Sequence, residues 1–145
     1  MNPWQSELEK LEQSFAFLQM LGFRGPAANI VGSKLVGDSL LLRYEHASQN
    51  RQIHITYNKG GERTDRSIVI VILAGNRNFL LRDYLDSIGR LESKSAFVEP
   101  LNAVGEADFI DAAAAAFQQI AKGALSKTLA GLEWPSVEFD WKGMR

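Results

Sequence analysis

The feature that most restricts the fold of this chain is an uninterrupted apolar run near its middle, Ile68–Leu73, which reads IVIVIL. Every residue in it except the last is β-branched, and β-branched side chains favour the extended conformation. A strand with one face in solvent normally alternates apolar and polar residues, whereas a run without alternation is typical of a strand buried on both sides. We therefore predict a central strand over Ser67–Ala74 that is covered on both faces.

Two segments before this run do alternate between apolar and polar residues, Ser39–His46 and Arg51–Asn58. If residues 47–50 form the turn between them, Leu42 lies opposite Ile55, and the large apolar residues of both strands share one face. Short turns then join three consecutive strands, which predicts an antiparallel meander.

The segment Ser6–Glu9 has the form of a capping box and therefore predicts the start of an N-terminal helix. Gly22 suits the left-handed position that follows a last helical turn. The helix is expected to bury an apolar stripe in which residues recur at spacings of three and four: Leu8, Leu11, Phe15 and Leu18.

Two further segments contain glycine or proline residues that interrupt regular secondary structure. Residues 24–37 contain Gly25-Pro26, Gly32 and Gly37, and we predict a loop there with a short strand at Asn29–Val31. Gly75–Asn78 is predicted to end the sheet.

Two helices are predicted in the C-terminal half. The first begins at Leu80 or Leu81, runs to Ile88 and is closed by Gly89. The second covers about Ala107–Ala130, with Gly123 as a point where it can break. Its buried stripe is expected to contain Ile110, Ala113, Ala114, Phe117, Ile120 and Ala121.

These elements predict an α+β fold: an antiparallel β-meander of three to five strands, packed against an N-terminal helix and two C-terminal helices. The length of 145 residues, without an evident linker or repeat, indicates a single domain over residues 1–145.

The amino-acid composition excludes several classes of functional site. The chain has no cysteine, which excludes disulfides, thiolate nucleophiles and zinc–thiolate sites. The N-terminus lacks the pattern of a signal peptide, and the longest apolar run is far shorter than the ~20 residues of a membrane span. We expect a cytoplasmic protein that does not associate with a membrane.

No motif for catalysis, metal binding or nucleotide binding is present in the sequence. The two histidines, His46 and His54, are predicted to lie on opposite faces of the hairpin and therefore cannot share a metal ion. We expect no catalytic residue, no metal, no cofactor and no enzymatic activity.

Four residues are candidates for binding a partner: Arg43, His54, Phe139 and Trp141. Arg43 and His54 are predicted to lie side by side on the polar face of the hairpin. In the tail, apolar residues alternate with Glu138 and Asp140, so Phe139 and Trp141 would share one side of a strand. Aromatic anchors ringed by charge are typical of binding hot spots, and such a strand can add to a sheet.

A second possibility is a domain that binds a small ligand or nucleic acid through a basic region, Arg43–Arg90, which contains eight Arg or Lys residues against five Asp or Glu residues. Nucleic acid is the less favoured ligand because Glu45, Glu62 and Asp65 dilute the positive charge and few aromatic residues are available for stacking.

The order of elements resembles that of a large, loose group of small bacterial cytosolic proteins. The shared features are a helix ending in Leu21-Gly22-Phe23, a meander ending in Ser67–Leu73, a short helix at Phe79–Ile88 and a long helix ending near Leu132-Glu133-Trp134. Some members of that group are immunity proteins that neutralise a cognate toxin. The resemblance implies a non-catalytic protein-binding module whose partner is another protein.

Overall fold

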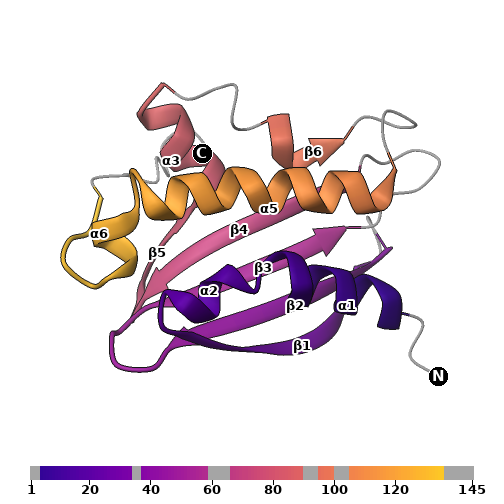
Figure 1. The fold of residues 1–145 in the computed structure, drawn as a ribbon, viewed down its shortest axis with the longest axis horizontal. Coiled ribbons are helices and arrows are strands. Elements are labelled where there is room, and N and C mark those ends of the chain that lie inside the picture. Colours follow the sequence, from indigo (N-terminus) through magenta and orange to yellow (C-terminus); the bar gives the residue numbers. More distant parts are fainter. Residues whose placement is uncertain (1–3, 34–36, 59–65, 90–94, 100–104, 136–145) are drawn as a thin grey trace.

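A computed structural model describes residues 4–33, 37–58, 66–89, 95–99 and 105–135. Within these residues one antiparallel sheet has the strand order β1-β2-β3-β4-β5, and a short strand, β6, also pairs with β4 (Figure 1). The strands are β1 (Phe23–Ser33), β2 (Gly37–His46), β3 (Gln52–Asn58), β4 (Arg66–Ala74), β5 (Arg77–Leu80) and β6 (Val98–Glu99).

The helices pack on one side of this sheet, with α1 and α5 running across it (Figure 1). The predicted α+β architecture is confirmed. None of the helices in the described ranges is long and apolar enough to span a bilayer. The helical elements are α1 (Gln5–Ser14), α2 (Phe17–Met20), α3 (Leu81–Ser87), the 3-10 turn η1 (Ser95–Phe97), α5 (Glu106–Lys122) and α6 (Ser126–Leu129).

The predicted register of the central hairpin is confirmed. Leu42 pairs with Ile55, and Leu40 pairs with Tyr57. All four side chains are fully buried, because the period of two along a strand directs alternate residues to the same face.

Within the described residues, the expectation that β4 is covered on both faces is not met. Ile68, Ile70 and Ile72 are buried against the helices, whereas Val69, Val71 and Leu73 are only half-buried. Within the described residues, helices lie against one face of the sheet. The half-buried side chains on the other face have cross-strand neighbours on β3 and β5.

The short strand predicted at Asn29–Val31 is confirmed, but the loop predicted around it is wrong, because β1 is a long edge strand that runs from Phe23 to Ser33. The Gly25-Pro26 pair is accommodated by a shift in register between Arg24 and Ala27, and an edge strand tolerates the missing proline N–H. Gly25 has φ +127°, and a Cβ there would lie 2.8 Å from the carbonyl oxygen of Arg43.

The sheet does not end at Gly75–Asn78 as predicted. Gly75 and Asn76 instead form a two-residue turn, after which β5 pairs with β4 from Arg77 onwards. Gly75 has φ +63°, a conformation that such tight hairpin turns require and that glycine adopts at no steric cost.

The predicted helix ends are confirmed more often than the predicted start. The capping box is not formed, because α1 begins at Gln5 and includes Ser6, with Trp4 as the N-cap residue. The single N-terminal helix predicted up to Gly22 is broken at Phe15 and Ala16 into α1 and α2. Gly22, at φ +96°, follows the last turn of α2, and Gly123 separates α5 from α6. All six residues of the stripe predicted for α5 are buried.

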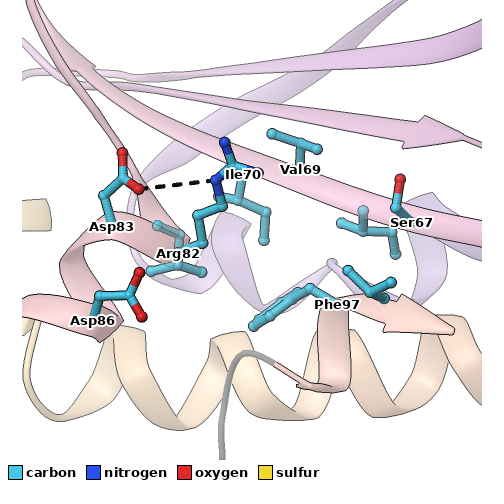
Figure 2. Close-up of a pocket in the computed structure, with 10 residues that line it drawn as sticks. Ser67, Val69, Ile70, Arg82, Asp83, Asp86 and Phe97 are labelled. Atoms are coloured by element: carbon cyan, nitrogen blue, oxygen red, sulfur yellow. Dashed lines mark ion pairs between the residues drawn. The ribbon is translucent and has the colours of Figure 1, made fainter. Parts of the chain in front are cut away.

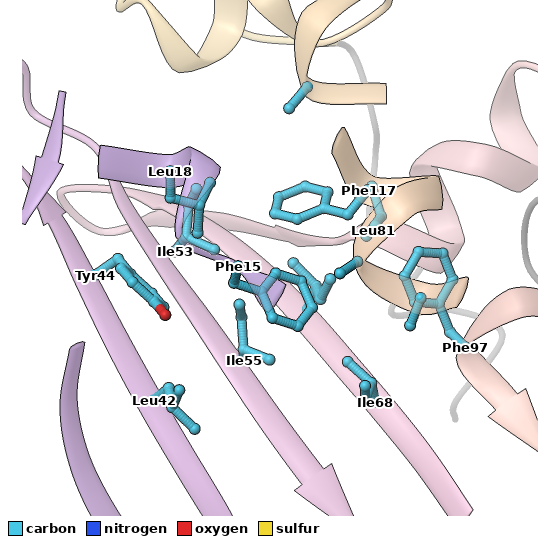
Figure 3. Close-up of a cluster of buried hydrophobic side chains, with 14 of the residues drawn as sticks. Phe15, Leu18, Leu42, Tyr44, Ile53, Ile55, Ile68, Leu81, Phe97 and Phe117 are labelled. Atoms are coloured by element: carbon cyan, nitrogen blue, oxygen red, sulfur yellow. The ribbon is translucent and has the colours of Figure 1, made fainter. Parts of the chain in front are cut away.

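The core lies between α5, the α1–α2 segment and the inner face of the sheet. Three aromatic rings meet there: Phe15 contacts Phe17 and Phe117 at centroid distances of 6.1 and 6.3 Å, and Phe17 and Phe117 are 6.0 Å apart. Figure 3 shows Phe15 and Phe117 above Ile55 and the neighbouring strand residues. The cluster joins the helical layer to the sheet.

Truncation of Phe117 to alanine is expected to lower the free energy of unfolding by about 3–5 kcal/mol, because it opens a cavity at this junction. Urea denaturation monitored by circular dichroism measures the change. Gln119→Ala, at an exposed position of the same helix, is the control and should change stability by less than about 0.5 kcal/mol. Equal midpoints for the two variants would show that Phe117 is not a core residue.

Two buried tyrosines should respond in opposite ways to loss of the hydroxyl group. Within the described part of the chain, the Tyr44 hydroxyl has no hydrogen-bond partner, so Tyr44→Phe should leave stability unchanged or raise it by about 1 kcal/mol. The Tyr57 hydroxyl donates a hydrogen bond to the Glu106 carboxylate, and Tyr57→Phe should therefore cost about 1–3 kcal/mol. Calorimetric unfolding distinguishes the variants, and a larger loss for Tyr44→Phe than for Tyr57→Phe would contradict the assignment.

Candidate binding surfaces

The predicted pair Arg43 and His54 lies together on the sheet face that the described helices leave uncovered. The two residues are direct cross-strand partners on β2 and β3. Arg43 is exposed, and a terminal nitrogen of its guanidinium lies 2.7 Å from the side-chain amide of Asn29 on β1. His54 is half-buried, and its Nε2–H donates to the side-chain oxygen of Gln52 at 3.1 Å.

The environment of His54 disfavours its protonation. Burial lowers the pKa of His54 below its ordinary value of 6.5, and the positive charge of Arg43 lowers it further. The ring is therefore neutral near pH 7. The pair presents one fixed positive charge next to a neutral imidazole that can both donate and accept hydrogen bonds.

The rest of this face, which we call the open face, combines half-buried apolar residues with polar ones. A polar row crosses it near one end, where Ser39 hydrogen-bonds the side chain of Asn58, and Asn58 donates to Ser67 at 3.0 Å. The half-buried apolar residues of the open face are Leu41, Val69, Val71, Leu73 and Leu80.

A shallow hollow of about 510 Å³ adjoins Arg43. It lies where the register of β1 shifts at Gly25-Pro26, and Arg24, Glu45 and Gln52 contribute to its walls. The irregularity in β1 that the sequence marks with glycine and proline therefore shapes the surface beside the predicted pair.

The other predicted residues are not on the open face. Phe139 and Trp141 lie outside the described residues. His46 is on the helix-covered side, as predicted, where its Nε2–H donates to the Leu21 carbonyl oxygen at 3.1 Å. Its Nδ1 accepts hydrogen bonds from the backbone N–H groups of Ser48 and Gln49, so His46 holds the end of α2 against the β2–β3 turn.

Arg51, a member of the predicted basic region, has a structural role. Its Nε–H donates to the Thr128 carbonyl oxygen at 2.7 Å, and one terminal nitrogen donates to the Glu133 carbonyl oxygen at 3.0 Å. The guanidinium also lies 5.2 Å from the ring centroid of Trp134. Arg77 lies 5.0 Å from the same ring, and Trp134 packs edge-on against Phe79 at 5.1 Å. Two of the basic residues thus fasten the α6–Pro135 segment to the sheet.

A part-buried polar contact joins the other end of the sheet to the helices. Tyr57 on β3 donates to Glu106 at the start of α5, and Trp4 packs edge-on against the Tyr57 ring at 6.4 Å. Burial raises the pKa of Tyr57, as does the Glu106 carboxylate that accepts its hydrogen bond. Glu7 of α1 is also buried here. This contact holds α1, β3 and α5 together.

A second cavity, of about 620 Å³, lies at the outer edge of β4 (Figure 2). Sequence reasoning did not find it, because it lies between segments that are distant in the chain and depends on how α3 and η1 leave the sheet. Its lining residues are Ser67–Ile70 of β4, Leu81, Arg82, Asp83 and Asp86 of α3, Phe97 of η1 and Val98 of β6.

Comparisons of this chain with protein-family models, with curated proteins and with solved structures find no match. The resemblance to immunity proteins therefore stays a prediction. Among the described residues no group of three or more histidine, aspartate or glutamate side chains could hold a metal ion. The expected absence of a metal and of catalysis is not tested by this observation.

The lowered pKa of His54 can be measured directly by following its ring resonances in an NMR titration. We expect a pKa below 6.5. Since the unfolded chain binds this proton more readily than the folded protein, the contribution of His54 to stability is full above the unfolded pKa and falls as the pH drops below it. Arg43→Gln should raise the pKa only part of the way, because burial is the larger cause. A pKa at or above 6.5 in the unmodified protein would contradict the described packing.

Proposed function

We propose that this chain is a non-catalytic protein-binding module of the bacterial cytoplasm, of the toxin-neutralising immunity type, and that it binds its partner through the open face around Arg43 and His54. The observation that carries the proposal is the composition of this face. It combines an arginine, a neutral histidine and half-buried aliphatic residues on one antiparallel sheet. Arginine beside apolar contact area is typical of interface hot spots.

The geometry of the open face also favours a macromolecular partner over a small ligand. The hollow beside Arg43 is shallow and opens along the sheet surface, whereas small-molecule sites are concave and enclose most of the ligand. The aliphatic residues are spread over β2, β4 and β5, an arrangement that suits a broad contact with another protein.

The alternative of a nucleic-acid or small-ligand domain built on the Arg43–Arg90 region is less well supported. Arg51 and Arg77 contact Trp134 and the α6–Pro135 segment, so they are not arranged as a shared phosphate-binding surface with Arg43. Phosphate recognition requires several cations that can reach one backbone.

The experiment is co-expression with each product of the flanking genes, followed by size-exclusion chromatography with light scattering. We expect one of these products to form a stable equimolar complex and to lose its toxicity to cells. Arg43→Glu should weaken that complex by about 10–100-fold, because it reverses the charge at the centre of the proposed contact. His54→Glu should act in the same direction.

Lys122→Glu is the matched control, because Lys122 is an exposed cation at the end of α5, on the helical side of the molecule. It should leave the affinity unchanged. Equal losses of affinity in Arg43→Glu and Lys122→Glu would show a general charge effect. They would contradict the open face as the binding surface. If every gene product bound the protein, and Arg43→Glu did not change the affinity, the open face would be contradicted as well.

A further inference from the structure

One edge of β1 pairs with β2, and the other edge faces outward. β1 is the first strand in the order of the sheet (Figure 1). Within the described residues, no strand pairs with its outer edge anywhere along Phe23–Ser33. Proteins usually shorten, charge or cover such an edge, because its free N–H and C=O groups pair readily with another chain.

The hydrogen bonds of β2 show which backbone groups of β1 face outward. The His46 N–H donates to the Arg51 carbonyl oxygen on the side of β3, and the Ala47 N–H donates to the Gly22 carbonyl oxygen on the side of β1. Along an antiparallel strand the backbone groups alternate between the two edges. The odd-numbered residues of β2 therefore bond to β1, and their partners there include Asn29 and Val31.

It follows that Ala28, Ile30 and Gly32 direct their N–H and C=O groups toward the outer edge of β1. The side-chain amide of Asn29 lies 3.0 Å from the Ala28 carbonyl oxygen. A carbonyl oxygen can accept a second hydrogen bond, so this contact does not prevent strand pairing.

The features that usually protect an edge occur at one end of β1 only. Pro26 and the shift in register lie next to Arg24, whereas neither proline nor a charged residue occurs in Ala27–Ser33. Charged side chains and proline are the common means of preventing edge-to-edge pairing. The segment Ala27–Ser33 is therefore able to accept another strand.

Two exposed aliphatic side chains flank this segment, one on each face of the sheet. Ile30 is 47% exposed and Val31 is 44% exposed. Leu40, which is the neighbour of Ile30 on β2, is buried on the helical side. Ile30 lies one strand further out, where the described helices leave it partly uncovered. A strand added at this edge would cover part of both side chains.

The position of Ile30 favours a second copy of the same chain as that strand. Ile30 is the midpoint of Ala27–Ser33, and both of its backbone groups face outward. Two copies can therefore pair antiparallel with Ile30 opposite Ile30 and use the whole segment in each. On β2, Asp38 and Arg43 lie beside opposite ends of the segment. Antiparallel pairing places Asp38 of one copy at the same end as Arg43 of the other.

We propose that this chain forms a symmetric homodimer through the outer edge of β1. The two strands pair antiparallel about Ile30, so that Ala28 of each copy lies opposite Gly32 of the other. The two sheets then form one continuous sheet, with both open faces on the same side. The interface is separate from the open face and does not depend on the function proposed for it.

Sedimentation velocity of the full chain measures the proposed association. One short strand per copy buries less surface than a stable dimer needs, so we expect a dissociation constant on the order of 10–100 μM. The fraction of dimer should rise as the protein concentration increases through this range. A monomer at every concentration would overturn the proposal, and the same result would follow if another segment of this chain covers the edge.

Ile30→Lys should weaken the dimer by about 10-fold or more, because it places two like charges directly opposite each other. Ile88→Lys is the matched control, since Ile88 is also an isoleucine and is 41% exposed. It follows α3, which packs on β4 and β5, far from β1 in the order of the sheet. Ile88→Lys should leave the dissociation constant unchanged, and equal losses in the two variants would overturn the assignment to β1.

A mixture of two variants tests the register. Ile30→Lys and Ile30→Glu should each dimerise weakly alone, whereas their mixture should form a heterodimer about 10-fold tighter, because unlike charges then lie opposite each other. The mixture of Val31→Lys and Val31→Glu is the control. In the proposed register Val31 lies opposite Asn29 of the other copy, so the gain should be smaller. No gain at Ile30, or an equal gain at Val31, would overturn the register.

Amide hydrogen exchange at low and high protein concentration provides an independent reading without any variant. The amides of Ile30 and Gly32 face the outer edge and should exchange more slowly in the dimer. Those of Asn29 and Val31 already bond to β2 and should change less. Equal slowing of all four would indicate general stabilisation of β1 and would contradict strand pairing at its edge.

Discussion

The rest of this structure depends on the antiparallel register of β2, β3 and β4. Leu42, Ile55 and Ile70 lie in one row across the three strands, and the neighbouring rows repeat the arrangement. A slip of one residue in any strand would turn its apolar side chains to the opposite face. The register therefore produces a single continuous apolar surface, and the helices bury it. Phe15 and Phe117 bring the N-terminal and C-terminal helices to the same part of that surface.

Polar contacts at the two ends of the sheet complete this arrangement. At one end Tyr57 and Glu106 connect β3 to α5, and Lys10 of α1 forms an ion pair with Asp111 of α5 at 2.8 Å. At the other end Arg51 binds backbone carbonyl groups near α6. Each contact joins segments far apart in the sequence. The buried ones are the more consequential, because an exposed ion pair contributes little to stability and a buried donor left without a partner costs more.

Covering one face of a sheet leaves the opposite face and the edges to interact with other molecules. On the open face, Arg43 and His54 lie among aliphatic residues that are only half-buried. At the edge, β5 and β6 protect β4 on either side of Ile70 and leave a short gap between them. Exposed edges are usually blocked or kept short, since they pair readily with other strands.

By itself the sequence determined the elements whose signal is local. The alternation in β2 and β3 predicted their register, and the glycines at positions 22, 89 and 123 marked helix ends that the structure confirms. The placement of Arg43 beside His54 followed from the same alternation. Only the tertiary structure decided that, among the described residues, the helices cover one face of β4, because an apolar run is compatible with one or two covered faces. It also decided that residues 24–33 form a strand, since the hydrogen bonds of β2 outweigh the weak local preference of a segment rich in glycine and proline. The cavity beside α3 and the role of Arg51 could not be predicted either, because each depends on contacts between residues distant in the sequence, and these form only when the whole chain packs.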